Sequence, residues 1–391
     1  MEFDLNETQK LFQRSARELF TQELPSVLAR ETTEKNTDFS AKIWRQLVSQ
    51  GWTGLIFAED QGGMGLGTVE LAVAFEEMGR ALVPGPFMST VPLAGSLICR
   101  AAPGAVRDKY VKMISEGEAK ATVAILEDSA AWEPAAIQLH AADDAGGVKL
   151  SGRKLFVTDA NEADLIIVAA RSANGLVLAL VPSDSAGVSV SAMPSIDTLR
   201  PLYEVALTGV RVPADRILAR GKQAEEALAH AIDVATIAVT AEMVGGMQWM
   251  LDATVEYAKT RKQFGKPIGQ FQAIQHHCAN MLLMTESSRS AVYYAAWAMD
   301  ARPELAPLAV SVAKTYASDC YRESGNLGIQ VHGGIGFTWD HEIHFYYKRA
   351  KASELLFGDA TFHRERIAKR VIDHAGDQAE QPQKAAAESA D

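Results

Sequence analysis

Two unusually long helical patterns lie in the C-terminal part of the chain, and they restrict the fold more than any other feature. Residues 224–259 and 268–299 can each form one continuous helix. A helix of this length is usually supported laterally by others, because packing supplies most helical stability in water. We therefore predict an antiparallel four-helix bundle over residues 223–375.

Before this bundle, the predicted secondary structure changes from helices to strands at about residue 119. Residues 1–118 favour helices, since Leu11, Leu19 and Phe20 recur at helical spacing and Asn6 can cap the first helix. Further helices are expected around 42–50, 69–81 and 105–115, and the helix at 69–81 is expected to end before the turn-forming residues Pro84–Pro86. These patterns predict an N-terminal helical domain.

Residues 119–222 contain short β-type runs separated by turn residues. The expected strands are 122–126, 137–141, 154–157, 165–169, 176–181, 188–191 and 204–212. Asn174 and Gly175 tolerate the positive φ of a tight hairpin. Strands at this spacing without intervening helices predict a small antiparallel β-barrel or sandwich. The fold class is therefore α+β, and the apolar-poor segment 376–391 is expected to be a disordered tail.

The composition indicates a globular protein without nucleic-acid or membrane partners. Hydrophobic residues make up 48% and charged residues 22% of the 391 residues, which excludes wholesale disorder. A net charge of −11 argues against binding by phosphate neutralisation. The chain has no apolar run of about 18 residues and no secretory start. Cys99, Cys278 and Cys320 are odd in number and widely spaced, which favours reduced thiols and a cytoplasmic location.

Common catalytic and metal-binding motifs are absent. His341 and His344 have the wrong spacing for a zinc-binding helix, so no metal site is predicted. The glycine-rich run 62–67 has no strand before it, which argues against a dinucleotide-binding turn.

Two stretches in the bundle are more informative. In the first, Arg261, Gln263, Phe264 and Gln272 gather at a corner between two helices, and a guanidinium with amides and an aromatic ring suits a pyrophosphate beside a purine. In the second, residues 330–338 carry glycines that let backbone amides approach an anion. On spacing alone, a solvated helix hairpin and a flexible turn remain open.

Together the two stretches resemble the acyl-CoA dehydrogenase family, and the resemblance extends over nearly the whole chain. The segments 51–55 and 62–65 look like the family's N-terminal loop, and 210–213 looks like its exit from the β domain. The resemblance implies a tetrameric flavoenzyme with FAD at a dimer interface. Such an enzyme removes a proton from the α-carbon of an acyl-CoA and passes hydride from the β-carbon to the flavin. An electron-transferring flavoprotein is the implied electron acceptor.

The resemblance assigns cofactor-binding residues in two groups. The first group would reach the FAD held mainly by the neighbouring subunit: Arg261, Gln263, Phe264, Gln272, Gln330, Gly333 and Gly334. In the second group, Phe156, which stands where Trp is usual, and Thr158 would contact the flavin ring of their own chain.

The chain departs from the family pattern at its own flavin loop and at the catalytic base. The loop at 125–134 lacks the family's glycine, which allows close approach of the backbone to the flavin. Phe357 occupies the usual position of the Glu base, and Ala235 occupies the alternative position. Asp359 is the substitute candidate, although a carboxylate there would equally suit the start of a helix.

Three hypotheses follow. In the first, the chain completes the FAD site of a partner in a heteromeric acyl-CoA dehydrogenase, as half-complete subunits of the family do in steroid side-chain degradation. In the second, it is a self-sufficient flavoenzyme with Asp359 or another residue as base, or an oxygen-using relative. In the third, it is a flavin-free structural subunit.

Overall fold

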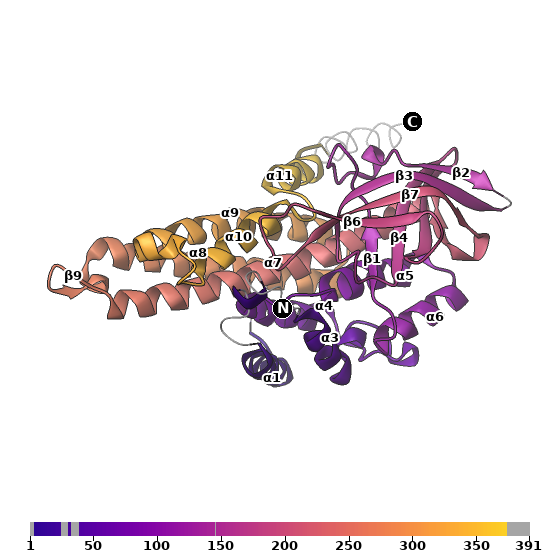
Figure 1. Ribbon diagram of the computed structural model, residues 1–391. Helices are drawn as coiled ribbons and strands as arrows, with labels where there is room; N and C mark the ends of the chain where they lie inside the picture. The colour runs from indigo at the N-terminus through magenta and orange to yellow at the C-terminus, as the bar shows by residue number, and fades with distance from the viewer. Residues whose placement is uncertain (1–3, 25–29, 33–38, 145, 374–391) are drawn as a thin grey trace, which may run out of the picture.

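The structure is a computed structural model that describes residues 4–24, 30–32, 39–144 and 146–373. N-terminal helices, a β-sheet and a helical bundle follow one another along the chain, as the sequence predicts. Figure 1 shows the bundle extending away from the sheet, with the N-terminal helices packed beside both. The expected disordered tail at 376–391 lies outside the described residues.

The N-terminal region contains the predicted helices and additional helical segments between them, among them η3 and α5. Its helices are α1 (Glu7–Glu23), α3 (Ser40–Ser49), α4 (Thr68–Ala81), η3 (Ser89–Gly95), α5 (Ser96–Ala101) and α6 (Gly104–Ser115). Asn6 caps α1 as predicted, since its Oδ1 accepts a hydrogen bond from the Gln9 backbone N–H at 2.9 Å. The unpredicted π-helical η3 is buried along its whole length and contains Pro92, so it has no polar face to give a helical period.

The β region forms one eight-stranded sheet. Its strands are β1 (Ala121–Ala124), β2 (His140–Asp144), β3 (Gly147–Thr158), β4 (Leu165–Ser172), β5 (Gly175–Pro182), β6 (Val188–Met193), β7 (Leu202–Val212) and β8 (Ile217–Arg220). The order is β6-β7-β3-β2-β4-β5-β8, and β1 pairs with β4. A tight turn joins β4 to β5 one residue earlier than predicted: Ser172 pairs with Gly175, so the two loop residues are Ala173 and Asn174 and Gly175 begins β5.

The sheet is mixed rather than purely antiparallel. β1 runs parallel to β4, because the two strands start side by side: the Asp164 backbone N–H donates to the Lys120 carbonyl at 2.9 Å. β2 starts later than predicted, at His140. The backbone N–H groups of Gln138 and Leu139 donate to the Glu127 carboxylate, which keeps them out of the ladder.

The bundle consists of α7 (Gly221–Thr260), α8 (Gln272–Ala301), α9 (Ala306–His332) and α10 (Ile343–Leu355), followed by α11 (Ala360–Ala368). A short hairpin of β9 (Lys262–Gln263) and β10 (Lys266–Pro267) joins α7 to α8. Length and composition alone would let α7 cross a membrane, but 89% of its most apolar window is buried inside the protein. It is the central core helix, and residues 231–247 are buried without interruption.

Close contacts fix the N-terminal helices against the bundle. A Cβ on Gly79 of α4 would lie 2.0 Å from the Glu242 carbonyl, and a Cβ on Gly245 of α7 would lie 1.8 Å from the Glu76 carbonyl. Asp300 at the end of α8 accepts hydrogen bonds from the Thr68 backbone N–H at 2.8 Å and the Thr68 hydroxyl at 2.7 Å, which caps α4. The N-terminal helices and the bundle are therefore held as one frame beside the site described next.

Candidate functional site

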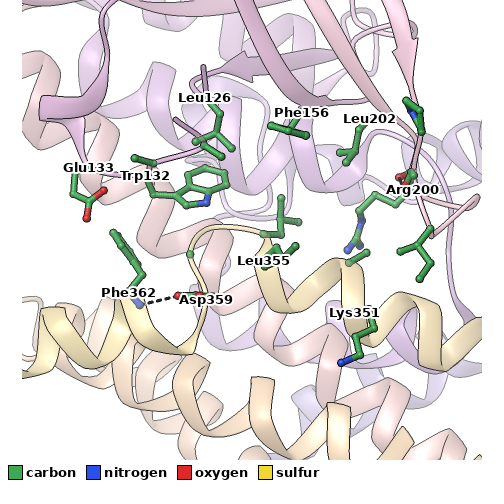
Figure 2. A pocket seen from close by; sticks show the side chains of 18 residues that line it. Leu126, Trp132, Glu133, Phe156, Arg200, Leu202, Lys351, Leu355, Asp359 and Phe362 are labelled. Atoms are coloured by element: carbon green, nitrogen blue, oxygen red, sulfur yellow. Dashed lines mark hydrogen bonds between the residues drawn. The ribbon is translucent and has the colours of Figure 1, made fainter. Parts of the chain in front are cut away.

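A cavity of about 490 Å³ lies between the β-sheet and the end of the bundle (Figure 2). Its walls come from the loop after β1, from β3, from the β6–β7 connection and from the α10–α11 region. The middle is apolar, lined by side chains that include Leu126, Trp132, Phe156, Leu202, Leu355 and Phe362. Glu133 and Asp359 lie at one end, and Arg200 and Lys351 lie at the other (Figure 2).

Phe156 and Thr158 lie on the same strand and share one small space, but only Phe156 also lines the large cavity. Phe156 adopts a φ of +56° with 38% of its surface exposed, and it lines the large cavity. Thr158 is buried and lines, with Phe156, a neighbouring space of only about 10 Å³. Trp132 and Phe357 close this second space, with their ring centroids 5.3 Å apart in an edge-on contact.

Neither expected base position carries a carboxylate with access to a ligand. Phe357 is 1% exposed at a φ of +60°, and Ala235 is fully buried. Asp233, near Ala235, accepts hydrogen bonds from the Arg366 guanidinium at 2.8 and 3.2 Å. Its carboxylate is therefore engaged in a buried ion pair.

Asp359 caps α11. Its Oδ1 accepts a hydrogen bond from the Phe362 backbone N–H at 2.8 Å, and its backbone is extended, as N-cap residues usually are. The half-buried carboxylate also lines the acidic end of the large cavity. This geometry agrees with the helix-start interpretation of Asp359.

The other predicted residues lie at the opposite end of the bundle, far from this cavity. Arg261 follows α7, Gln263 and Phe264 lie in the hairpin, and Gln272 begins α8 (Figure 1). Gln330, Gly333 and Gly334 lie at the end of α9. A small apolar cluster of Ala258, Ile268 and Val331 packs between them and brings the two stretches together.

The predicted residues at this end are all exposed, and we call them the distal cluster: Arg261, Gln263, Phe264, Gln272, Gln330, Gly333 and Gly334. Within the described part of the chain, the side chains of Arg261, Gln263, Gln272 and Gln330 form no hydrogen bond or ion pair. Phe264 is 90% exposed at a φ of +53°. A Cβ on Gly333 or Gly334 would meet no atom within 4 Å, although the φ of +65° at Gly333 itself favours glycine there. The cluster is therefore available to a group outside this chain.

A buried ionic network near the cavity escaped the sequence analysis. The Arg349 guanidinium contacts Asp197 and Glu242, and Arg200 donates to Glu242 at 2.5 Å and to the Ser353 hydroxyl at 3.0 Å. The network ties the β6–β7 connection to α7 and α10. Two buried lysines, Lys154 and Lys314, were missed as well. Glu242 and Lys314 lie inside otherwise apolar helical patterns, and this pattern could have indicated that both are buried charged residues.

Comparison with family models covers the three regions in turn. The N-terminal, middle and C-terminal domains of acyl-CoA dehydrogenase match residues 6–118, 122–209 and 226–372. The chain belongs to the acyl-CoA dehydrogenase family.

Individual relatives match along their full length. The probable acyl-CoA dehydrogenase YngJ of Bacillus subtilis is 27% identical over 382 residues, covering 95% of this chain and 100% of that protein. The ChsE4–ChsE5 complex of Mycobacterium tuberculosis gives a TM-score of 0.86 at 26% identity, with 98% and 100% of the two chains covered. A variant of the Tcur3481–Tcur3483 steroid ACAD gives 0.83 at 29% identity, with 95% and 100% covered.

Proposed function

We propose that this chain is a subunit of an FAD-dependent acyl-CoA dehydrogenase, and that it completes the FAD site of a partner chain. The observation that carries the proposal is the contrast between its two candidate regions. The distal cluster is free and exposed, whereas the space beside Thr158 is closed by Trp132 and Phe357.

The distal cluster fits the diphosphate end of FAD. The free Arg261 guanidinium suits a charged phosphate oxygen, and a backbone without Cβ atoms at Gly333 and Gly334 allows close approach. The exposed Phe264 ring offers a face to the adenine. When bound, the flavin accepts hydride from the acyl group. The role of this chain is to bind and orient the cofactor with its distal cluster, while the partner provides the other half of the site.

The chain's own half of a flavin site does not fit the cofactor. A flavin ring beside both Phe156 and Thr158 would need far more than the roughly 10 Å³ found there. Phe357 and Ala235 cannot accept the proton from an acyl α-carbon, because neither side chain has a basic atom. In this proposal the partner supplies the base.

The solved relatives support a partner of the same family. The ChsE4–ChsE5 complex and the Tcur3481–Tcur3483 steroid ACAD each carry two protein names. We extend the proposal to a mixed tetramer in the cytoplasm that acts on an acyl-CoA with a steroid or fatty acyl group. An electron-transferring flavoprotein would be the acceptor.

The first test is the flavin-to-chain ratio and the native mass of this chain purified alone. We expect far less than one FAD per chain, measured by flavin absorbance after denaturation. FAD should appear when an acyl-CoA dehydrogenase chain that retains the Glu base is co-expressed. One tightly bound FAD per chain in a homotetramer would contradict the proposal.

The second test is Arg261→Ala in the flavin-containing complex. Loss of a guanidinium that pairs with phosphate should remove most of the FAD, because charge-assisted hydrogen bonds to phosphate are among the stronger contacts. Lys262→Ala is the matched control, since Lys262 is the next residue and is also exposed. Equal FAD content in the wild type and in Arg261→Ala would rule out this role.

A further inference from the structure

The two loops that close the space beside Thr158 are each held by a fully buried lysine. The 125–139 connection carries Trp132, and the 356–359 loop carries Phe357. The relative exposures of Lys154 and Lys314 are both 0%. A lysine is rarely buried completely without a specific partner, so both side chains need an explanation.

Lys154 holds the first loop close to its start. Its ammonium donates to the Ile125 carbonyl at 2.8 Å and to the Glu127 carboxylate at 2.7 Å. The same carboxylate accepts from the backbone N–H groups of Gln138 and Leu139. One ion pair therefore joins the two ends of the 125–139 connection, and its charge is balanced directly.

Lys314 holds the second loop without a direct carboxylate partner. Its Nζ lies within hydrogen-bonding distance of four oxygens that share its three hydrogens: the carbonyls of Ser353 at 3.1 Å, Glu354 at 2.9 Å and Gly358 at 3.0 Å, and the Ser318 hydroxyl at 3.2 Å. These contacts join the end of α10 to the far side of Phe357. An ammonium has three donor hydrogens and no acceptor, which suits a ring of oxygens.

The segment that Lys314 holds is conformationally strained. Phe357 has a φ of +60° and Gly358 a φ of +100°, and a bulky residue in the left-handed region persists only when its surroundings enforce it. His363 Nε2 contacts the Phe357 carbonyl at 3.1 Å and fixes the next peptide. The clamp therefore maintains the backbone that directs the Phe357 ring onto Trp132.

We propose that the Lys314 ammonium is a positioning clamp that keeps Phe357 against Trp132 and so keeps the space beside Thr158 closed. This inference rests on the proposed function, in which the chain's own site is the closed one. A neutral amine has only two hydrogens and a lone pair, and the lone pair would face carbonyl oxygens. Loss of the proton therefore loosens the 356–359 loop.

The burial of Lys314 brings the pKa for this proton loss close to neutral pH. Burial lowers the pKa of the Lys314 ammonium to about 7, although the charges of Glu354 and Asp359 oppose that shift. On α11, burial together with the charges of Lys314 and Arg366 lowers the pKa of His363 to about 3. His363 therefore titrates far below Lys314. Burial also raises the pKa of Asp159 to about 7 and lowers the pKa of Lys154 to about 8, so a transition near neutral pH is assigned to Lys314 by its loss in Lys314→Met.

The test uses fluorine NMR of the full chain labelled with fluorotryptophan, without flavin or partner. The chain contains six tryptophans, and Trp132→Phe assigns the relevant signal. We expect the Trp132 signal of the wild type to change between about pH 6 and about pH 9, with a midpoint near 7. In Lys314→Met the signal should lie near its high-pH position and show no transition.

Two further variants keep the test decisive. Lys369→Met removes an exposed lysine at the end of α11 and should retain the wild-type transition. Ser318→Ala removes one acceptor of the ammonium, so the midpoint should move to lower pH even if Lys314→Met does not fold. A wild-type signal that stays constant over this range, or a transition that persists in Lys314→Met, would overturn the proposal. Neither result bears on FAD binding through Arg261, so the two proposals fail independently.

Discussion

Phe357 and Asp359 lie two residues apart in one loop, yet their side chains have opposite surroundings. Phe357 is buried against Trp132, whereas Asp359 is half-buried and bonded to the first turn of α11. A general base must reach the proton that it removes. In this loop the buried position has no basic atom, and the carboxylate is already used as a helix cap.

Substitution of Asp359 distinguishes a cap from a base. Asn caps helices about as well as Asp, so Asp359→Asn should leave both the unfolding free energy and the turnover of the flavin-containing complex close to wild type. Asp359→Ala removes the acceptor for the Phe362 N–H and should cost about 1 kcal/mol in urea unfolding. A loss of turnover by orders of magnitude in Asp359→Asn, at unchanged stability, would instead identify Asp359 as the base.

At the scale of secondary-structure elements, the buried ionic network fixes the cavity wall. Arg349 of α10 is 1% exposed and pairs with Asp197 of the β6–β7 connection and Glu242 of α7. Arg200, which lines the cavity, pairs with the same Glu242. The network therefore determines where the β6–β7 connection lies relative to the bundle.

Removing one residue of this network should lower the free energy of unfolding. Arg349→Met leaves Asp197 and Glu242 without their shared partner in a buried site, and breaking such a pair typically costs about 3–5 kcal/mol. Urea unfolding measures the change. Arg153→Met is the control: Arg153 is about half exposed and pairs with Asp128 at the surface, where an ion pair is worth at most about 1 kcal/mol. If the two variants lose the same free energy of unfolding, the network does not hold the β6–β7 connection against the bundle.

Local patterns explain which elements could be predicted from the sequence. The helix at α1 was found because its apolar period and the Asn6 cap lie within a few residues of each other. The buried η3 lacks a polar face, and the four-residue β8 is too short to show a period. The parallel pairing of β1 with β4 depends on a contact between Lys120 and Asp164 that no local pattern reveals.

The site could be predicted only where its residues form continuous motifs. The stretches around Arg261 and Gln330 stand out as continuous motifs and carry the family resemblance, and the structure places them together through Ile268 and Val331. Lys314 was missed because its partners are mainly backbone carbonyls, which leave no trace in the sequence. The closure of the site was missed because Trp132 and Phe357 meet only after folding.

At the scale of the whole molecule, the two candidate regions lie at opposite ends of the bundle (Figure 1). One cofactor cannot contact the Phe156 wall and the Arg261 cluster of the same chain, since α7 separates them along its length. An α-helix rises about 1.5 Å per residue, and α7 has 40 residues. In the proposed function, the free groups at the distal end therefore act on another chain.

Phe264 gives the sharpest test of this arrangement. Its ring is 90% exposed and contacts only Phe271 edge-on, at 6.0 Å between centroids, among the described aromatic residues. Phe264→Ala should therefore change the unfolding free energy of the isolated chain by no more than about 0.5 kcal/mol, as exposed substitutions usually do. Stacking of an aromatic ring on a base is worth about 1–3 kcal/mol, so FAD should dissociate from the complex about tenfold more readily.

The control is Leu11→Ala, because Leu11 is 60% exposed on α1, away from the hairpin. Calorimetry of the isolated chain and flavin release from the complex would be measured for both variants. An effect on flavin release without an effect on the isolated chain means that the contacts of Phe264 form only across the subunit boundary. If Phe264→Ala releases flavin no faster than Leu11→Ala, the hairpin does not reach the cofactor, and the exposed ring needs another partner.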